Sequence, residues 1–123
     1  MKQLSSILII LFLFACINDP NSYHADFGSD YVILQTAELP SIRNDSLIVR
    51  IAYSGCNGGH SFVLRNRYIN SSTTEIWLYK QTPDQLCDAY FEETRYFHLT
   101  DEMIEATKIV LIGPHDFRIT IKE

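Results

Sequence analysis

Alternation of apolar and polar side chains is the feature that most constrains the fold of this chain. Between residues 46 and 54, four apolar side chains share one face, and Arg50 lies on the other: Leu47, Val49, Ile51 and Tyr53. Because successive side chains of a strand point to opposite faces, this period of two predicts a half-buried β-strand. The chain also holds seven Tyr, seven Phe and one Trp, and these large rigid side chains favour strands.

Similar patterns predict the rest of the fold. Further strands are expected over residues 31–36, 60–68, 75–80, 108–112 and 116–122, and a bulged strand within 87–98. A short helix is expected over 100–106, where Thr100 can cap and two acids follow in the first turn. Six or seven strands with one short helix predict a mainly β fold, either an antiparallel β-sandwich or an open barrel.

Two of these strands are expected to form a hairpin. Ser54, Gly55, Asn57, Gly58 and Gly59 tolerate the backbone conformations of a turn. The alternation that resumes at residue 60 therefore suggests that segment 60–68 returns antiparallel to segment 46–54. Segment 75–80 carries large apolar groups on both faces, which predicts burial on two sides.

The first fifteen residues have the pattern of a secretory signal. Lys2 is the single charge, and residues 7–15 carry no polar side chain. A transmembrane helix needs roughly 20 apolar residues, so this run is too short to span a bilayer. We expect a signal peptidase to remove residues 1–15.

The residues at the end of this run, Leu13, Phe14, Ala15 and Cys16, resemble the lipobox of bacterial lipoproteins. The resemblance implies that Cys16 carries the lipid, with simple secretion as the alternative. The expected organisation is a signal peptide at 1–15, a lipidated tether at 16–29 and a single β-rich domain at 30–123. The expected location is the bacterial cell envelope, with the outer membrane as the default.

Two cysteines remain once Cys16 is assigned to the lipid. An exported protein meets an oxidising compartment, so Cys56 and Cys87 are expected to form a disulfide. A reduced pair for redox chemistry or metal binding is the alternative, although no Cys-x-x-Cys spacing is present. Zinc could be held by Cys56, His60, Cys87 and one further His, but oxidation of an exported pair is the better-supported interpretation.

A Gly-Cys turn at Gly55, a His-x-Phe strand start at His60 and a second Cys before an acidic, aromatic strand lie within residues 50–100. In these features the chain resembles a group of small bacterial lipoproteins of unknown function. The resemblance implies a disulfide-tied β domain and carries no catalytic residue onto this chain.

Composition and motifs limit the function classes. Loss of Lys2 with the signal changes the formal net charge from -5 to -6, which disfavours nucleic acid as a partner and leaves a basic partner open. Neither Ser54 nor Ser61 lies in a Gly-x-Ser-x-Gly frame, and no phosphate-loop motif is present, so no enzymatic activity and no cofactor are expected. Asp45-Ser46-Leu47 resembles a short acceptor pattern for O-linked sugar on Ser46, with a turn that opens a strand as the alternative.

The expected function is that of an envelope-anchored binding or structural module, held to the membrane by the lipid on Cys16, with an unknown protein or glycan as partner. One alternative is an inhibitor of a secreted hydrolase such as lysozyme or a protease. Another is a sugar-binding accessory lipoprotein that uses Trp77 and exposed tyrosines, although Trp77 is flanked by Ile76 and Leu78 and fits a core position. The predicted interaction loop consists of Ser54, Gly55, Asn57, Gly58, Gly59 and His60, braced by Cys56.

Overall fold

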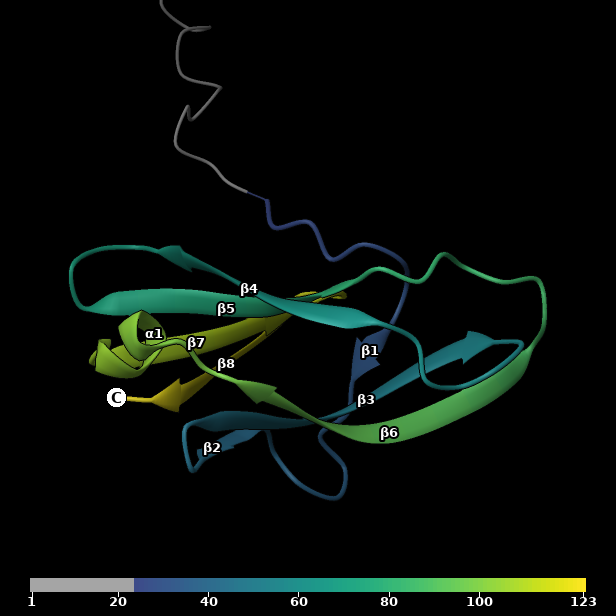
Figure 1. The fold of residues 1–123 in the computed structure, drawn as a ribbon, viewed down its shortest axis with the longest axis horizontal. Coiled ribbons are helices and arrows are strands. Elements are labelled where there is room, and N and C mark those ends of the chain that lie inside the picture. Colours follow the sequence, from purple (N-terminus) through teal and green to yellow (C-terminus); the bar gives the residue numbers. More distant parts are fainter. Residues whose placement is uncertain (1–23) are drawn as a thin grey trace, which may run out of the picture.

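Two β-sheets pack face to face in the computed structural model, which describes residues 24–123 (Figure 1). The described residues form eight strands and one helix: β1 (Val32–Ile33), β2 (Ser41–Arg43), β3 (Ser46–Gly55), β4 (Phe62–Tyr68), β5 (Thr73–Lys80), β6 (Ala89–His98), α1 (Asp101–Glu105), β7 (Lys108–Gly113) and β8 (Phe117–Lys122). The expected mainly β-sandwich with one short helix is confirmed, and the sheets do not close into a barrel. The predicted signal peptide and Cys16 lie outside the described residues.

The first sheet is built around β3. Strand β6 pairs with one side of β3, and β1 and β2 pair with the other side, all antiparallel. The β3–β6 register runs without interruption from Ser46 opposite His98 to Gly55 opposite Ala89. The bulge expected within residues 87–98 is therefore wrong.

The second sheet has the order β4-β5-β7-β8, and β5 and β7 are parallel. The hairpin expected between segments 46–54 and 60–68 is wrong, because β4 pairs with β5 and β3 pairs with β6. Residues 56–61 instead carry the chain from one sheet to the other. Alternation determines which face of a strand is buried, but it does not determine which strand pairs with it. The apolar face of β4 can therefore pack against β3 across the core without pairing with it. Tyr53 of β3 meets Phe62 of β4 in this way, with ring centroids 5.9 Å apart.

The core lies between the two sheets. The apolar face predicted for β3 is buried there, and full burial of an aliphatic side chain stabilises the fold by about 1.5–3 kcal/mol. The inner face of the second sheet and the segment around α1 supply the opposing side chains, which include Phe62, Ile76, Leu78, Leu99, Met103, Ile109 and Leu111.

Strand β5 is buried on both faces, as its sequence predicts. On the outer face, the N-terminal described residues cover Trp77, whose indole N–H donates to the carbonyl of Asp26 over 3.1 Å. Glu75 lies beside Trp77 on that face and accepts from Arg67 at 3.1 Å and from Arg118 at 2.7 Å. Burial alone would raise the pKa of Glu75, but these two guanidinium groups outweigh it and lower the pKa.

The helix and the final hairpin also agree with the sequence. The Thr100 hydroxyl accepts from the Met103 N–H over 3.2 Å, which caps α1, and β7 and β8 pair antiparallel. Strand β2 is short and was not expected, and its turn into β3 places Asn44 and Asp45 at positive φ. The turn interpretation of Asp45-Ser46 is thus confirmed, whereas glycosylation of Ser46 stays a prediction. Within residues 24–123, no helix is long and apolar enough to cross a membrane.

Candidate functional site: a braced loop

The expected disulfide joins the ends of two paired strands. Cys56 directly follows β3, Cys87 precedes β6, and the bridge places their Cα atoms 4.7 Å apart with a χ3 of 85°. Both sulfurs are used in this bond, so these cysteines are not available as thiolate ligands for zinc. The bridge closes one end of the sandwich, where residues 55–60 and 81–88 lie together at the right of Figure 1. We call residues 55–60 the braced loop.

Glu93 of β6 holds the C-terminal part of the braced loop. One oxygen of its carboxylate accepts from the backbone N–H of Gly59 over 2.9 Å and also from the hydroxyl of Tyr53. The other oxygen accepts from Arg95 over 2.8 Å. Burial would raise the pKa of Glu93, but the hydrogen bonds from Tyr53, Gly59 and Arg95 and the charge of Arg95 lower it. Glu93 is therefore an anion that organises the loop.

His60 closes the loop from inside the protein. It is 2% exposed, and its ring stacks on Tyr53 with centroids 4.3 Å apart. Its backbone N–H donates to the Tyr53 hydroxyl over 3.1 Å, and its carbonyl accepts from Arg95 over 2.6 Å. Nε2 lies 3.2 Å from Oε1 of Gln85, while Nδ1 has no hydrogen-bond partner among residues 24–123. His60 therefore positions the loop and cannot reach a partner from this place.

Of the remaining loop residues, Gly55 supports the loop from inside, and residues 56–59 form its exposed tip. Gly55 is buried, and an added Cβ there would lie 2.6 Å from Oε1 of Gln85, the atom that accepts from the Cys56 N–H. Cys56, Asn57, Gly58 and Gly59 are exposed. Gly59 has a φ of +72°, a conformation that side chains with a Cβ rarely adopt. The tip is consequently open to solvent while its backbone is fixed.

Lys80 is a buried group at this site that the sequence did not indicate. It is 1% exposed, its ammonium donates to the carbonyl of Asp30 over 3.1 Å, and it lies 4.8 Å from the centroid of the Tyr53 ring. Burial lowers the pKa of Lys80, and the nearby charges of Asp84 and Asp30 partly offset that effect. The position of Lys80 at the end of a strand buried on both faces was the one available signal.

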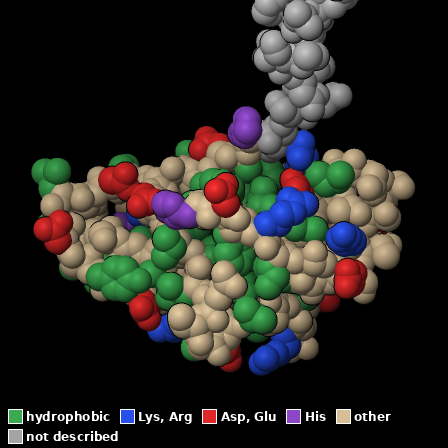
Figure 2. Space-filling view, turned by 180° about the vertical axis from the view of Figure 1, so that it is seen from behind, with side chains coloured by type: hydrophobic (Ala, Val, Ile, Leu, Met, Phe, Trp, Pro, Cys, Tyr) green, Lys and Arg blue, Asp and Glu red, His purple; other side chains and the backbone are tan. Residues whose placement is uncertain are grey.

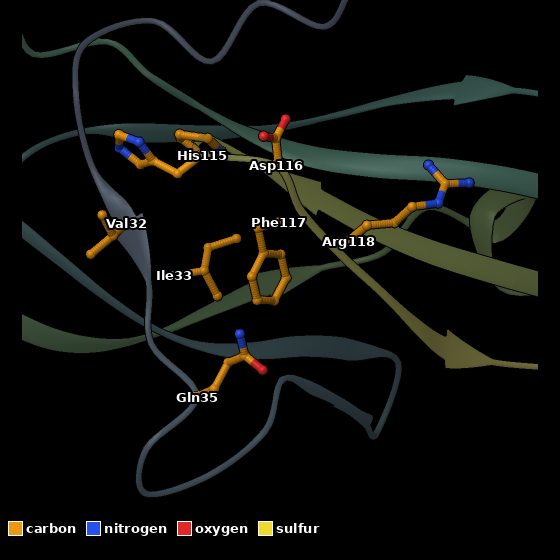
Figure 3. A pocket seen from close by; sticks show the side chains of 8 residues that line it. Val32, Ile33, Gln35, His115, Asp116, Phe117 and Arg118 are labelled. Atoms are coloured by element: carbon orange, nitrogen blue, oxygen red, sulfur yellow. The ribbon is translucent and has the colours of Figure 1, made fainter.

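Two open depressions lie near these groups. A pocket of about 170 Å³ beside the braced loop is lined by Asp30, Ser54, Asp84 and Gln85. A larger cleft of about 350 Å³ lies where β1 meets the β7–β8 turn, with Phe117 beside Ile33 and with His115 and Asp116 on the turn (Figure 3). Nε2 of His115 is 3.3 Å from the carboxylate of Asp30, so Asp30 connects the two depressions.

Metal binding and sugar stacking are two further roles that the sequence raised. Among residues 24–123, no cluster of three or more His, Cys, Asp or Glu side chains could hold a metal ion. Trp77 is 3% exposed, so its ring cannot serve as a stacking platform for a sugar in this arrangement. Exposed aromatic side chains do occur elsewhere, at Tyr68, Tyr90 and Tyr96.

Comparisons with protein-family models, with curated proteins and with solved structures find no match for this chain. The resemblance to small bacterial lipoproteins therefore stays a prediction, and function is inferred from the sequence and from the geometry of the braced loop.

Proposed function

We propose that this chain is a lipid-anchored binding module of the bacterial cell envelope and that the braced loop contacts its partner. Support for the anchor comes from the apolar run that ends at Cys16. Support for the binding role comes from the loop.

The observation that carries the proposal is that the exposed tip is held by groups outside it. Backbone N–H groups of Cys56, Gly59 and His60 donate to side chains outside the loop, and the disulfide ties Cys56 itself. A loop that is already ordered loses little conformational freedom on binding, so more of its contact energy appears as affinity.

Charge indicates the chemistry of the partner. Asp84 and Asp88 lie close to Cys87, and Asp30 lines the adjacent pocket; all three are exposed. On the face drawn in Figure 2, acidic side chains gather toward the end that holds the loop, and basic ones gather toward the other end. A protein with a basic surface complements this end and would be steered toward it.

The loop can be tested in the full chain in cells by placing a photoreactive side chain at Asn57, an exposed tip residue. We expect light-dependent crosslinking to one protein that presents a basic surface. Ser71, which is exposed in the β4–β5 turn, is the matched control position and should give no such product. Equal products from both positions, or none from Asn57, would reject the loop as the contact surface.

Lipidation of Cys16 has its own test, so that the anchor can be rejected without rejecting the binding loop. Mass spectrometry of the mature protein should give the mass of residues 16–123 plus lipid, and Cys16→Ser should release the protein from the membrane fraction. An unmodified mature mass would leave the braced loop as a proposal for a secreted protein.

Inhibition of a secreted hydrolase is the second candidate, because an exposed loop with a fixed backbone is what a hydrolase inhibitor presents to an active-site cleft. The purified protein should then inhibit a lysozyme or a protease, and Asn57→Arg should reduce the inhibition while Ser71→Arg leaves it unchanged. An absence of inhibition across both enzyme classes would remove this candidate and leave the binding module.

A further inference from the structure

Strand β6 has a free edge. It pairs with β3 alone among the described strands, and it is ten residues long. The Leu99 N–H donates to the carbonyl of Asp45 over 2.9 Å, so the odd-numbered residues of β6 direct their backbone groups toward β3. The even-numbered residues therefore direct their N–H and C=O groups away from the sheet. These residues are Tyr90, Glu92, Thr94, Tyr96 and His98.

The other edges of the two sheets carry features that hinder pairing. Strands β1 and β2 have two and three residues. Strand β4 carries Arg65 and Arg67, and β8 carries Arg118 and Lys122. Short length and basic side chains are the usual means by which an edge is kept from adding a strand. Strand β6 has no Lys, Pro or Gly and no bulge in its register.

The two inward charges of β6 need a separate explanation, because a charge that points inward from an edge strand also hinders pairing. Glu93 and Arg95 alternate inward with the half-buried Phe91 and Phe97, and their side chains are 23% and 24% exposed. They have opposite sign and form an ion pair. They therefore exclude only those pairings that would bring like charges opposite each other.

Among the two-fold self-pairings of β6, only one places each inward charge opposite a charge of the other sign. Two copies of β6 related by a two-fold axis through the sheet place Thr94 opposite Thr94 when the axis passes through that residue. Glu93 of each copy then lies opposite Arg95 of the other, and Phe91 lies opposite Phe97. On the outer face, Glu92 lies opposite Tyr96, which is 68% exposed in the single chain. The Thr–Thr, opposite-charge and Phe–Phe pairs are of the kinds that stabilise an antiparallel ladder.

The neighbouring registers are worse. An axis through Glu93 places two Glu93 side chains opposite each other, and an axis through Arg95 does the same with two arginines. All three registers pair even-numbered residues with even-numbered ones, so the outward backbone groups of one copy meet those of the other, and the charges decide among them.

We propose that this chain forms a two-fold dimer in which β6 pairs antiparallel with β6 of a second copy, centred on Thr94. The dimer joins the two first sheets into one continuous sheet. It does not depend on the partner of the braced loop, whose exposed tip lies at the end of the strand.

Cysteine crosslinking in the full chain tests the register directly. The Cα atoms of a hydrogen-bonded antiparallel pair are about 5.5 Å apart, within the range that a disulfide spans. Thr94→Cys should give a covalent dimer on a non-reducing gel of membranes from oxidised cells. Thr120→Cys, an exposed threonine on the edge strand β8, is the control and should stay monomeric. No dimer from the Thr94→Cys variant, or equal dimer from both variants, would overturn the proposal.

Charge at the same position gives an independent test. Thr94 is exposed, its N–H does not bond to β3, and its hydroxyl accepts one long hydrogen bond of 3.3 Å from Arg50. Thr94→Lys and Thr94→Glu should therefore change the unfolding midpoint of the monomer little. Each variant of the full-length protein should dimerise at least about tenfold more weakly in sedimentation experiments, because like charges meet on the axis.

An equimolar mixture of the two variants should restore the dimer, since the ammonium introduced into one chain would then face the carboxylate introduced into the other. Thr120→Lys should sediment like the unaltered protein. A mixture no better than its components, or an unaltered protein that is monomeric at every concentration, would reject self-pairing.

Discussion

Removal of the Cys56–Cys87 disulfide is the perturbation whose magnitude follows most directly from the structure. Both cysteines are exposed, so Cys56→Ser with Cys87→Ser removes little buried area. The cost is therefore expected in the unfolded chain, where the bridge closes a loop between residues 31 apart. The loop-entropy relation gives about 3.7 kcal/mol for that length at 25 °C.

The folded loop should survive this change. Gln85 and Glu93 hold the N–H groups of Cys56 and Gly59 without using either sulfur. We therefore expect the Gly59 amide to stay protected from hydrogen exchange in the folded double variant, while the free energy of unfolding falls.

Urea unfolding of the oxidised protein and the double variant measures the effect. With an m-value of about 1–3 kcal/mol/M, the midpoint should fall by roughly 1–4 M, and the m-value should rise because the unfolded chain expands. A loss below about 1 kcal/mol would refute the reasoning about the unfolded state. A Gly59 amide that exchanges as fast as a free loop would show that the sulfur bridge, rather than Glu93, fixes the folded loop.

Three further predictions concern buried and half-buried polar groups. Glu93→Gln removes a charged acceptor from Gly59 and Arg95, so it should lower the free energy of unfolding by about 2–3 kcal/mol, whereas Glu92→Gln on the exposed face should cost under about 1 kcal/mol in the same urea assay. Tyr31→Phe removes a buried hydrogen bond of 2.6 Å to the Leu78 carbonyl and should lower the free energy of unfolding by about 1–2 kcal/mol. Burial also raises the pKa of Tyr31, so one tyrosine of the unaltered protein should resist ionisation in an absorbance titration while exposed tyrosines ionise. The pKa values of Glu75 and Glu93 lie below the ordinary 4.5 in the folded protein. Their contribution to the free energy of unfolding should therefore be complete above about pH 4.5 and should be lost as the pH falls through the folded pKa values. A flat stability profile between pH 5 and pH 3 would contradict this.

The sequence predicted which face of each strand is buried better than it predicted which strands pair. Alternation placed Leu47, Val49 and Ile51 on the buried face of β3, and the two-sided apolar pattern of β5 matched its burial. The same alternation in β4 suited a partner beside β3, yet the chain crosses the core after Gly55 and pairs β4 with β5. The periodicity of one segment does not show which other strand will pair with it. The partner of β3 is β6, which lies much later in the chain.

The candidate site was predicted in outline because cysteines and glycines are recognisable in a sequence by their covalent and conformational properties. Paired cysteines and clustered glycines indicated a braced turn, and the structure confirms the disulfide. His60 and Lys80 were the residues whose roles could not be predicted, since polar side chains usually face solvent and only tertiary contacts bury these two. Tyr53, whose place on the buried face the alternation predicted, contacts both of them and Glu93.

Glu93 and Arg95 connect the braced loop with the edge of β6, and this connection separates the two proposals experimentally. Glu93 accepts from the Gly59 N–H, and Arg95 donates to the His60 carbonyl, so the loop fixes both charges at the edge. Glu93→Gln should then loosen the loop and also remove the charge that selects the dimer register, whereas Thr94→Lys should weaken the dimer and leave the Gly59 amide protected. If Thr94→Lys also released the loop amide, as seen by hydrogen exchange in the monomer, then the edge and the loop would be one cooperative unit, and loss of dimer in that variant could not be assigned to charge on the axis.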